Sequence, residues 1–226
     1  MQKSSKIHKL SVISVICALA YLCMFVLRFK VLFLTFDIKD AVLAIASLIY
    51  GPVWGVISSA LVALLEMITV SETGFYGCIM NFLSSASFTF LCGLIYKYRK
   101  NMSGAVIGVI TGAFTVTAVM VLANLLITPY YMGVPRGEVL QMIPTLLLPF
   151  NAIKAVVNGA VTLLIYKPFS SGLKRAGVLP RKTESEYRLN QKTVMLTFIS
   201  IVVIIACVVV LFTMLNGSFE VFRVFE

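Results

Sequence analysis

The segment Pro-Phe-Asn-Ala-Ile-Lys at residues 149–154 places a lysine inside a stretch that is otherwise suited to lipid. Apart from Lys154, no residue in the range 139–166 is charged. An ammonium group inside a bilayer costs roughly 2.5–3.5 kcal/mol on insertion scales, so it needs a partner, water or a ligand. Asn151, Lys154 and Asn158 are spaced so that they share one face of a helix. We therefore expect a polar pocket beside this helix, close to one membrane surface.

The composition of the whole chain indicates an all-α integral membrane protein. Of its 226 residues, 60% are hydrophobic and 12% are charged, and its mean hydropathy is +0.99. A soluble domain does not need that much apolar surface. The net charge of +10 is then better explained by basic loops on the cytoplasmic side of a bilayer than by a nucleic-acid partner.

Seven apolar stretches are candidate membrane spans, and the basic segments suggest how they are connected. The expected spans are 10–27, 38–50, 53–70, 77–96, 104–129, 147–166 and 193–215. Gly51-Pro52 either kinks one helix or joins two short helices as a hairpin. Only the hairpin puts the basic segments 3–9, 97–100 and 167–192 on one side of the membrane, as the positive-inside rule favours. Pro149 would begin the sixth span, because proline is tolerated in a first helical turn.

This arrangement predicts a multi-pass protein of the cell membrane with a cytoplasmic N-terminus. We expect residues 1–176 to form a six-helix substrate-binding domain, and 177–192 to form a basic cytoplasmic linker. Residues 193–226 would add one transmembrane helix and a tail. That last helix has no internal charge, so we expect it to be an anchor and not a wall of the pocket.

Two interpretations of Lys154 are open at the level of sequence. It could pair with Glu66, the only acid inside an expected span. Alternatively, Lys154 and Asn151 could bind a ligand, since an ammonium and an amide suit a planar heterocycle with imide and carbonyl groups. Asn124 would lie at a similar depth, and either joins two helices by a hydrogen bond or lines the same pocket.

The first expected outer loop, residues 28–40, is unusually rich in phenylalanine for a solvated connector. Asp37 could cap the following helix, while Phe33 and Phe36 could form a lid over the pocket. The residues that we expect to bind the substrate are Asn151, Lys154, Asn124, Phe33, Phe36, Asp37, Asp40 and Asn81.

The sequence offers little support for an enzyme. It has no metal-ligand spacing, no nucleotide-binding phosphate loop and no Gly-x-Ser-x-Gly motif. We therefore expect no catalytic residues, no metal and no cofactor, and energy for any transport must come from partners. An intramembrane enzyme would have to use Glu66 or Lys154 as its acid–base group. A non-transporting scaffold would instead tolerate the change Lys154→Met.

The first span carries a small-residue face at Ser14 and Ala18, which are four residues apart. Such a face permits close helix contact. Packing inside the bundle and docking to a separate membrane protein are both consistent with it.

Several segments resemble the substrate-binding subunits (S-components) of energy-coupling factor (ECF) vitamin importers, in particular the riboflavin-specific type. The carrying segments are Asp-Ile-Lys-Asp at 37–40, 48–56 with Gly-Pro inside it, Leu-Glu-Met-Ile at 65–68, 73–77, 80–85, Leu-Pro-Phe-Asn-Ala-Ile-Lys at 148–154 and Tyr-Lys at 166–167. The resemblance spans roughly 8–176, and the Pro-Phe-Asn-x-x-Lys stretch is its most specific part.

The resemblance implies a six-helix bundle that binds riboflavin near the outer face, under the first loop. It implies that Asn151, Lys154 and Asn124 hydrogen-bond the flavin ring. It also implies that the face of Ser14 and Ala18 meets a transmembrane coupling subunit driven by two cytoplasmic ATPases. The chain departs from the pattern in its added segment 193–226, and in having a serine at position 14. An S-component for another vitamin or precursor is the alternative function.

Overall fold

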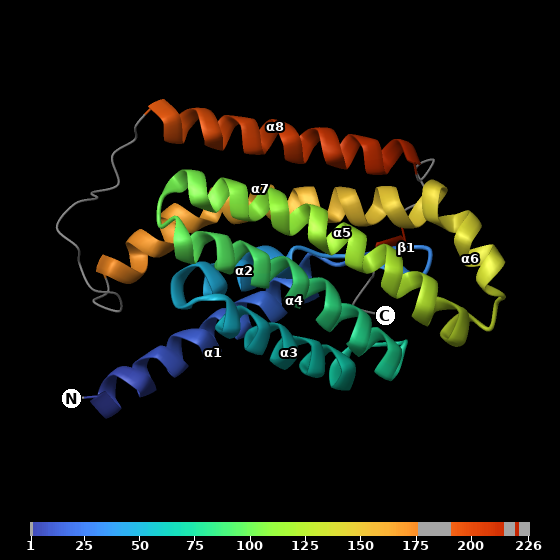
Figure 1. Ribbon diagram of the computed structural model, residues 1–226, viewed down its shortest axis with the longest axis horizontal. Helices are drawn as coiled ribbons and strands as arrows, with labels where there is room; N and C mark the ends of the chain where they lie inside the picture. The colour runs from blue at the N-terminus through green and yellow to red at the C-terminus, as the bar shows by residue number, and fades with distance from the viewer. Residues whose placement is uncertain (1, 176–190, 215–219, 222–226) are drawn as a thin grey trace.

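Long apolar helices lie side by side in a bundle, and the last of them packs along its outside (Figure 1). This computed structural model describes residues 2–175, 191–214 and 220–221. Its helices are α1 (Gln2–Val26), α2 (Lys39–Tyr50), α3 (Pro52–Thr69), α4 (Gly74–Tyr98), α5 (Met102–Met132), α6 (Arg136–Met142), the π-helix η1 (Ile143–Leu147), α7 (Leu148–Arg175) and α8 (Gln191–Met214). Its strands are β1 (Phe29–Val31), β2 (Leu34–Phe36) and β3 (Glu220–Val221).

Five of the described helical segments are long and apolar enough to cross a membrane: Ile7–Val26, Pro52–Thr69, Gly74–Tyr98, Met102–Met132 and Arg136–Gly172. An apolar stretch of α8, Val194–Val210, is shorter. α2 is different, because its 12 residues span only about 18 Å at 1.5 Å per residue. Its side chains from Lys39 to Leu48 are all buried, so α2 is a central helix that the others surround.

The predicted hairpin of two helices at Gly51-Pro52 is confirmed. Gly51 has a φ of 100°, which favours glycine, and its N–H donates to the carbonyl of Ser47 over 2.8 Å. Pro52 then begins α3, where its missing N–H is not needed. Gly93 of α4 lies so close that an added Cβ would be 2.0 Å from the hydroxyl of Ser47. The turn and this close approach fix α2 between α3 and α4.

Pro149 lies in the first turn of α7, as predicted, but α7 continues an earlier helical segment that the sequence did not indicate. α6, η1 and α7 form one continuous helical path from Arg136 to Arg175. The N–H of Leu148 donates to the carbonyl of Ile143, five residues back, which is the spacing of a π-helix. The wider turn precedes Pro149, whose ring and missing N–H are incompatible with regular α-helical bonding at that position.

The phenylalanine-rich loop folds as a β-hairpin that reaches into the end of the bundle. β1 pairs antiparallel with β2, with Phe29 opposite Phe36, and Leu32 turns the chain with a φ of 56°. β3 from the C-terminal segment pairs antiparallel with the other edge of β1. The all-α class therefore describes the bundle, and this small three-stranded sheet is an addition that the sequence pattern did not indicate.

α1 presents the predicted small-residue face outward. Ser14 and Ala18 are exposed, whereas Ile13, Ile16 and Ala20 are buried against α2 and α3. Packing of Ser14 and Ala18 inside the bundle is thereby ruled out, and the alternative of an external partner stays open.

Residues 176–190, which include nearly all of the expected linker 177–192, lie outside the described residues, as does most of the expected tail beyond 214.

Candidate functional site

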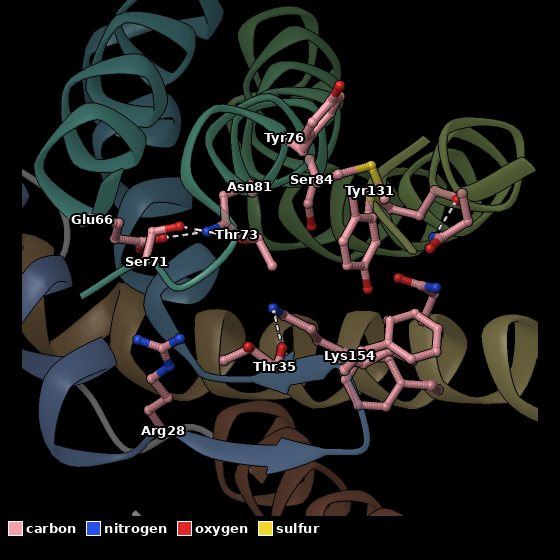
Figure 2. Close-up of a pocket in the computed structure, with 18 residues that line it drawn as sticks. Arg28, Thr35, Glu66, Ser71, Thr73, Tyr76, Asn81, Ser84, Tyr131 and Lys154 are labelled. Atoms are coloured by element: carbon pink, nitrogen blue, oxygen red, sulfur yellow. Dashed lines mark hydrogen bonds between the residues drawn. The ribbon is translucent and has the colours of Figure 1, made fainter. Parts of the chain in front are cut away.

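A cavity of about 100 Å³ opens at the end of the bundle that is remote from the N-terminus. The β-hairpin covers it, and α3, α4, α5 and α7 surround it (Figure 2). Its lining residues are Arg28, Phe33, Leu34, Thr35, Glu66, Ser71, Thr73, Tyr76, Gly77, Met80, Asn81, Ser84, Met120, Asn124, Tyr131, Phe150, Asn151 and Lys154.

Five of the eight expected substrate-binding residues line this cavity: Phe33, Asn81, Asn124, Asn151 and Lys154. The other three, Phe36, Asp37 and Asp40, are buried next to it and are not part of its lining. The ring of Phe36 stacks on Phe29 with centroids 4.7 Å apart, and meets Phe150 edge-on at 6.2 Å. Phe36 therefore fastens the hairpin to α7.

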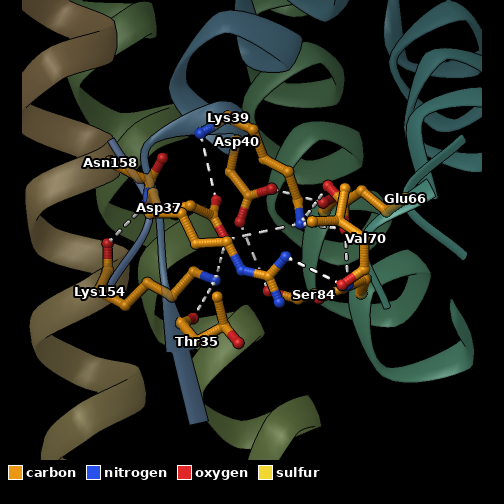
Figure 3. Close-up of polar contacts among 12 residues, drawn as sticks. Thr35, Asp37, Lys39, Asp40, Glu66, Val70, Ser84, Lys154 and Asn158 are labelled. Atoms are coloured by element: carbon orange, nitrogen blue, oxygen red, sulfur yellow. Dashed lines mark hydrogen bonds and ion pairs between the residues drawn. The ribbon is translucent and has the colours of Figure 1, made fainter. Parts of the chain in front are cut away.

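Lys154 is held by the hairpin and reaches the cavity. Its Nζ donates to the carbonyl of Thr35 over 3.0 Å (Figure 2) and to a carboxylate oxygen of Asp37 over 2.9 Å (Figure 3). An ammonium group has three N–H donors, so one is left for a ligand. The alternative in which Lys154 pairs with Glu66 was wrong, because a closer acid on the hairpin takes that place.

Glu66 pairs instead with Lys39, at the buried start of α2. Their closest oxygen–nitrogen distance is 2.7 Å, and Asn81 donates its amide to Glu66 over 2.5 Å. Lys39 also lies 3.6 Å from the carboxylate of Asp37. The two lysines therefore share Asp37, and one connected set of charges links α3, α2, the hairpin and α7 (Figure 3).

Asn158 of α7 fixes the segment that carries Asp37. Its amide nitrogen donates to the carbonyl of Asp37 over 3.0 Å, and its oxygen accepts the N–H of Ala41 over 2.9 Å. That N–H belongs to the first turn of α2, where helix donors have no internal partner. The Asp37 carboxylate in turn accepts the N–H of Lys39 over 3.2 Å. Asp37 thus contacts the start of α2 as expected, although Ile38 occupies the N-cap position itself.

Asp40, unlike Asp37 and Glu66, accepts its hydrogen bonds from hydroxyl groups and not from a lysine. Its two oxygens accept from the hydroxyls of Ser85 and Ser84 of α4, and its place in the first turn of α2 is favourable for a carboxylate. Ser84 also lines the cavity. The serine-rich face of α4 thus supports a buried acid beside the cavity.

Three asparagines present the same chemistry to the cavity. Asn81 donates its amide to Glu66, Asn124 to the carbonyl of Met120, and Asn151 to the carbonyl of Leu147. Each amide nitrogen keeps a second N–H, and each side-chain oxygen can accept a bond from a ligand, although that of Asn124 already accepts the hydroxyl of Thr128 over 3.0 Å. The lining thus offers amide acceptors next to the ammonium donor of Lys154.

The charges around the cavity balance. Arg28, Lys39 and Lys154 supply three cations, and Asp37, Asp40 and Glu66 supply three carboxylates. The side chain of Arg28 also donates to the carbonyl of Val70 over 3.3 Å. A site without excess positive charge is suited to an uncharged ligand, whereas an anion usually requires several free basic groups or helix N-termini.

Aromatic and methionine side chains supply the apolar part of the lining. At the tip of the hairpin, Phe33 meets the ring of Tyr131 of α5 at a centroid distance of 6.1 Å. Tyr131 and the other lining residues that we had not assigned to the site, such as Tyr76, Met80 and Met120, follow no motif. Tyr76 and Met80 lie in the quoted segments 73–77 and 80–85, and this was the signal available for them.

Over most of its length, the chain is similar to known membrane transport proteins. The family model described as "ECF transporter, substrate-specific component" matches residues 8–166. The riboflavin transporter RibU of Staphylococcus aureus (strain TCH60) is 28% identical over 181 residues, which cover 77% of this chain and 95% of that protein. The riboflavin transporter FmnP of Bacillus subtilis (strain 168) is 29% identical over 173 residues, covering 71% of this chain and 91% of that protein.

A solved structure is also similar. It is the S component of a bacterial ECF transporter, with a TM-score of 0.63 and 28% identity, and the match covers 77% of this chain and 100% of that one. Members of this family are transporter components and not enzymes. The matched range ends before α8, so α8 is additional to the family fold. The chain belongs to the family of substrate-specific components of ECF transporters.

Proposed function

We propose that this chain is the riboflavin-binding subunit of an ATP-driven vitamin uptake transporter of the ECF type. The observation that carries the proposal is the meeting of Asn124 of α5 with Asn151 and Lys154 of α7 at one cavity. Both relatives described above are riboflavin transporters, which supports the choice of vitamin.

The lining is chemically complementary to a flavin ring. The pyrimidine edge of a flavin has an imide N–H between two carbonyl oxygens, so it needs an acceptor flanked by donors. Asn124 and Asn151 supply amide oxygens, and Lys154 supplies the charged donor. The aromatic and methionine side chains can cover the planar ring. The balanced charge favours the uncharged vitamin over a phosphorylated form.

Binding would require the hairpin to move. A cavity of about 100 Å³ is smaller than the 300–1,000 Å³ that is usual for small-molecule sites. The contact of Phe33 with Tyr131 joins the hairpin tip to α5, and it is the contact that an entering ligand would separate first. The ion pair between Asp37 and Lys154 lies deeper, and would hold the base of the hairpin in place.

The orientation and partners follow from the same proposal. With the N-terminus in the cytoplasm, the basic segment 97–100 lies on the cytoplasmic side and the cavity faces outward, as uptake requires. The exposed face of Ser14 and Ala18 is where a transmembrane coupling subunit would dock, and two cytoplasmic ATPases would drive it. α8 would anchor the chain without contributing to the site.

Titration of the purified protein with riboflavin, followed by quenching of flavin fluorescence, tests the proposal. We expect saturable binding below micromolar concentrations, and weaker binding by Asn151→Ala and Lys154→Ala. Thr111→Ala is a matched control, because Thr111 lies on α5 away from the cavity. A protein that binds no riboflavin but is stabilised by another vitamin in a thermal-shift screen would instead be an S-component of different specificity. Stabilisation by none of them would favour a non-transporting scaffold.

A further inference from the structure

A second and larger cavity, of about 700 Å³, lies at the opposite end of the bundle. The hairpin turn between α2 and α3 forms one side of it, and the C-terminal parts of α4 and α7 form the other. Its lining residues are Ser47, Leu48, Ile49, Tyr50, Gly51, Pro52, Val53, Trp54, Gly93, Tyr96, Lys97, Lys100, Tyr166 and Ser170. We propose that this cavity binds the headgroup of an anionic phospholipid.

The charge at this end of the bundle is positive and uncompensated. Lys97 and Lys100 line the cavity and make no ion pair within the described residues. Lys9 of α1 lies at its rim, with Nζ 4.4 Å from the ring centroid of Trp54 and 5.2 Å from that of Tyr50. None of the acids in 2–175 and 191–214 lines this cavity. Glu66 lines the first cavity, Asp37 and Asp40 bond residues that line it, Glu72 pairs with Lys30 of β1, and Glu138 lies in α6.

The lysines, and not the backbone, must hold the anion. α2, α4 and α7 all end around this cavity, and the C-terminal ends of helices carry partial negative charge. The site would therefore depend on Lys97 and Lys100, which distinguishes it from an anion site at a helix N-terminus. This dependence makes the proposal sensitive to two single substitutions.

The remaining lining residues favour an amphiphile over a free phosphate ion. Tyr96 and Tyr166 are joined through their hydroxyl groups, with their rings edge-on at 5.5 Å. Together with Tyr50 and Trp54, they form a group of aromatic side chains of the kind found where a membrane meets water. Phosphate would meet the lysines, and the glycerol backbone would meet the aromatic rings.

A path for the acyl chains continues from the mouth of the cavity. Val53, Ile57 and Leu61 of α3 are exposed apolar residues spaced four apart, so they form one stripe along the helix. The stripe starts at the cavity, where Val53 is part of the lining, and runs toward the bilayer centre.

Trp54 provides a reporter at the site, since it is the only tryptophan in the chain. The full-length protein is placed in nanodiscs that contain phosphatidylglycerol or phosphatidylcholine with brominated acyl chains, and quenching of Trp54 gives the relative affinity for the two lipids. We expect a clear preference for phosphatidylglycerol that decreases as salt is added. Since a basic residue near an anionic surface contributes about 1 kcal/mol, each lysine removed lowers the preference roughly fivefold.

The variants separate the site from general surface charge. Lys97→Gln combined with Lys100→Gln should abolish most of the preference, and the corresponding double arginine variant should retain it. Arg99→Gln is the matched control: Arg99 is an exposed cation between the two lysines that does not line the cavity, and its loss should leave the preference unchanged. Unchanged riboflavin affinity in every variant shows that the fold is retained.

Three results would overturn the proposal. The wild-type protein could show equal quenching by the two lipids, which would leave the lysines to an acidic partner protein. Arg99→Gln could have the same effect as the lysine substitutions, which would indicate only a basic surface. Millimolar inorganic phosphate or glycerol phosphate could fully displace the lipid, which would make the ligand a soluble phosphate.

Discussion

α7 and α8 are long apolar helices that lie side by side (Figure 1), yet they differ in what they bury. α7 carries Asn151, Lys154 and Asn158 toward the centre of the bundle, and all three are buried. In α8, within the side chains that the structure describes, Ser200 is the one buried polar residue. The difference shows that a helix can be added to this fold for its apolar surface alone, whereas the polar face of α7 is built into a site.

The polar face of α7 is stable only because another segment supplies its partners. Thr35 of β2 and Asp37, which follows β2, accept hydrogen bonds from Lys154. The amide of Asn158 donates to the carbonyl of Asp37 and accepts from the N–H of Ala41. Among the described side chains of α8, the one buried polar group is the hydroxyl of Ser200. Substitutions on α7 and its partners should therefore change riboflavin affinity more than changes to α8 do.

Replacing Lys154 by methionine should have the largest effect, a loss of about 100-fold in riboflavin affinity, since a hydrogen bond from a charged group contributes about 1.5–3 kcal/mol. Flavin fluorescence titration measures it. The matched control is Ser200→Ala on α8, which should leave the affinity unchanged. Equal affinities for Lys154→Met and the wild type would remove Lys154 from the site.

Stability alone would not identify the role of Lys154. If the chain were a scaffold and the lysine unused, Lys154→Met would be tolerated. The observed pair with Asp37 changes that expectation, because breaking a buried pair destabilises by about 3–5 kcal/mol whatever the function. The double variant Asp37→Asn with Lys154→Met should recover part of the melting temperature but none of the affinity.

Asp37→Asn alone should have the second largest effect, a loss of about tenfold in affinity. Asp37 does not line the cavity, so it acts by holding the ammonium group of Lys154 in position. Its removal leaves one donor of Lys154 without its charged acceptor and lets that side chain move. Measuring association and dissociation separately, by stopped-flow flavin quenching, should show the change mainly in dissociation. A variant that binds as tightly as the wild type would show that the hairpin does not position Lys154.

The sequence predicted the helices and the central site residues for physical reasons that can be named. An isolated lysine and its neighbouring asparagines in an apolar helix required polar partners, and Asn124, Asn151 and Lys154 do meet at one cavity. The hairpin at Gly51-Pro52 followed from the distribution of basic residues. In both cases, the positions of charged and polar residues along the sequence were sufficient, because the bilayer excludes most alternative structures.

Other features depended on contacts between distant segments. From the sequence, Lys39 would lie in a solvated loop. In the structure, α2 is too short to reach the membrane surface, so the first turn of α2 and the charges that it carries are buried. The pairing of Lys154 with Glu66, one of the two interpretations left open, considered only acids inside spans and so missed Asp37. The first turn of α7 at Pro149 was predicted, but no sequence pattern indicated the π-helix that joins it to α6. Local sequence patterns also could not predict that β1 pairs with β3, because the two strands are nearly 200 residues apart.

Asn158→Ala should reduce riboflavin affinity less, by about threefold. Asn158 bonds the backbone that follows the hairpin and does not line the cavity. Its loss leaves the carbonyl of Asp37 without this donor, and leaves the N–H of Ala41 with only its longer bond to the carbonyl of Ile38, at 3.2 Å. Unsatisfied buried groups of this kind cost about 1–3 kcal/mol each, so the melting temperature should fall clearly. Thr162→Val is the comparison within α7, since the Thr162 hydroxyl bonds only within its own helix. Equal melting temperatures for Asn158→Ala and Thr162→Val would contradict a tie between α7 and the hairpin.

Removing residues 191–226 should have the smallest effect on affinity, less than about threefold, because no described residue of α8 lines the cavity. The deletion also removes β3, which pairs with the outer edge of β1. A hairpin that loses its third strand is less stable by itself, so riboflavin should dissociate faster, and associate faster to a similar degree. Shortening the chain after Met214, which keeps α8 but not β3, should reproduce the change in rates if the strand causes it. A large loss of affinity with the longer deletion, but not with the shorter one, would mean that α8 supports α7 and its binding face, and that the two helices are less independent than their polar residues indicate.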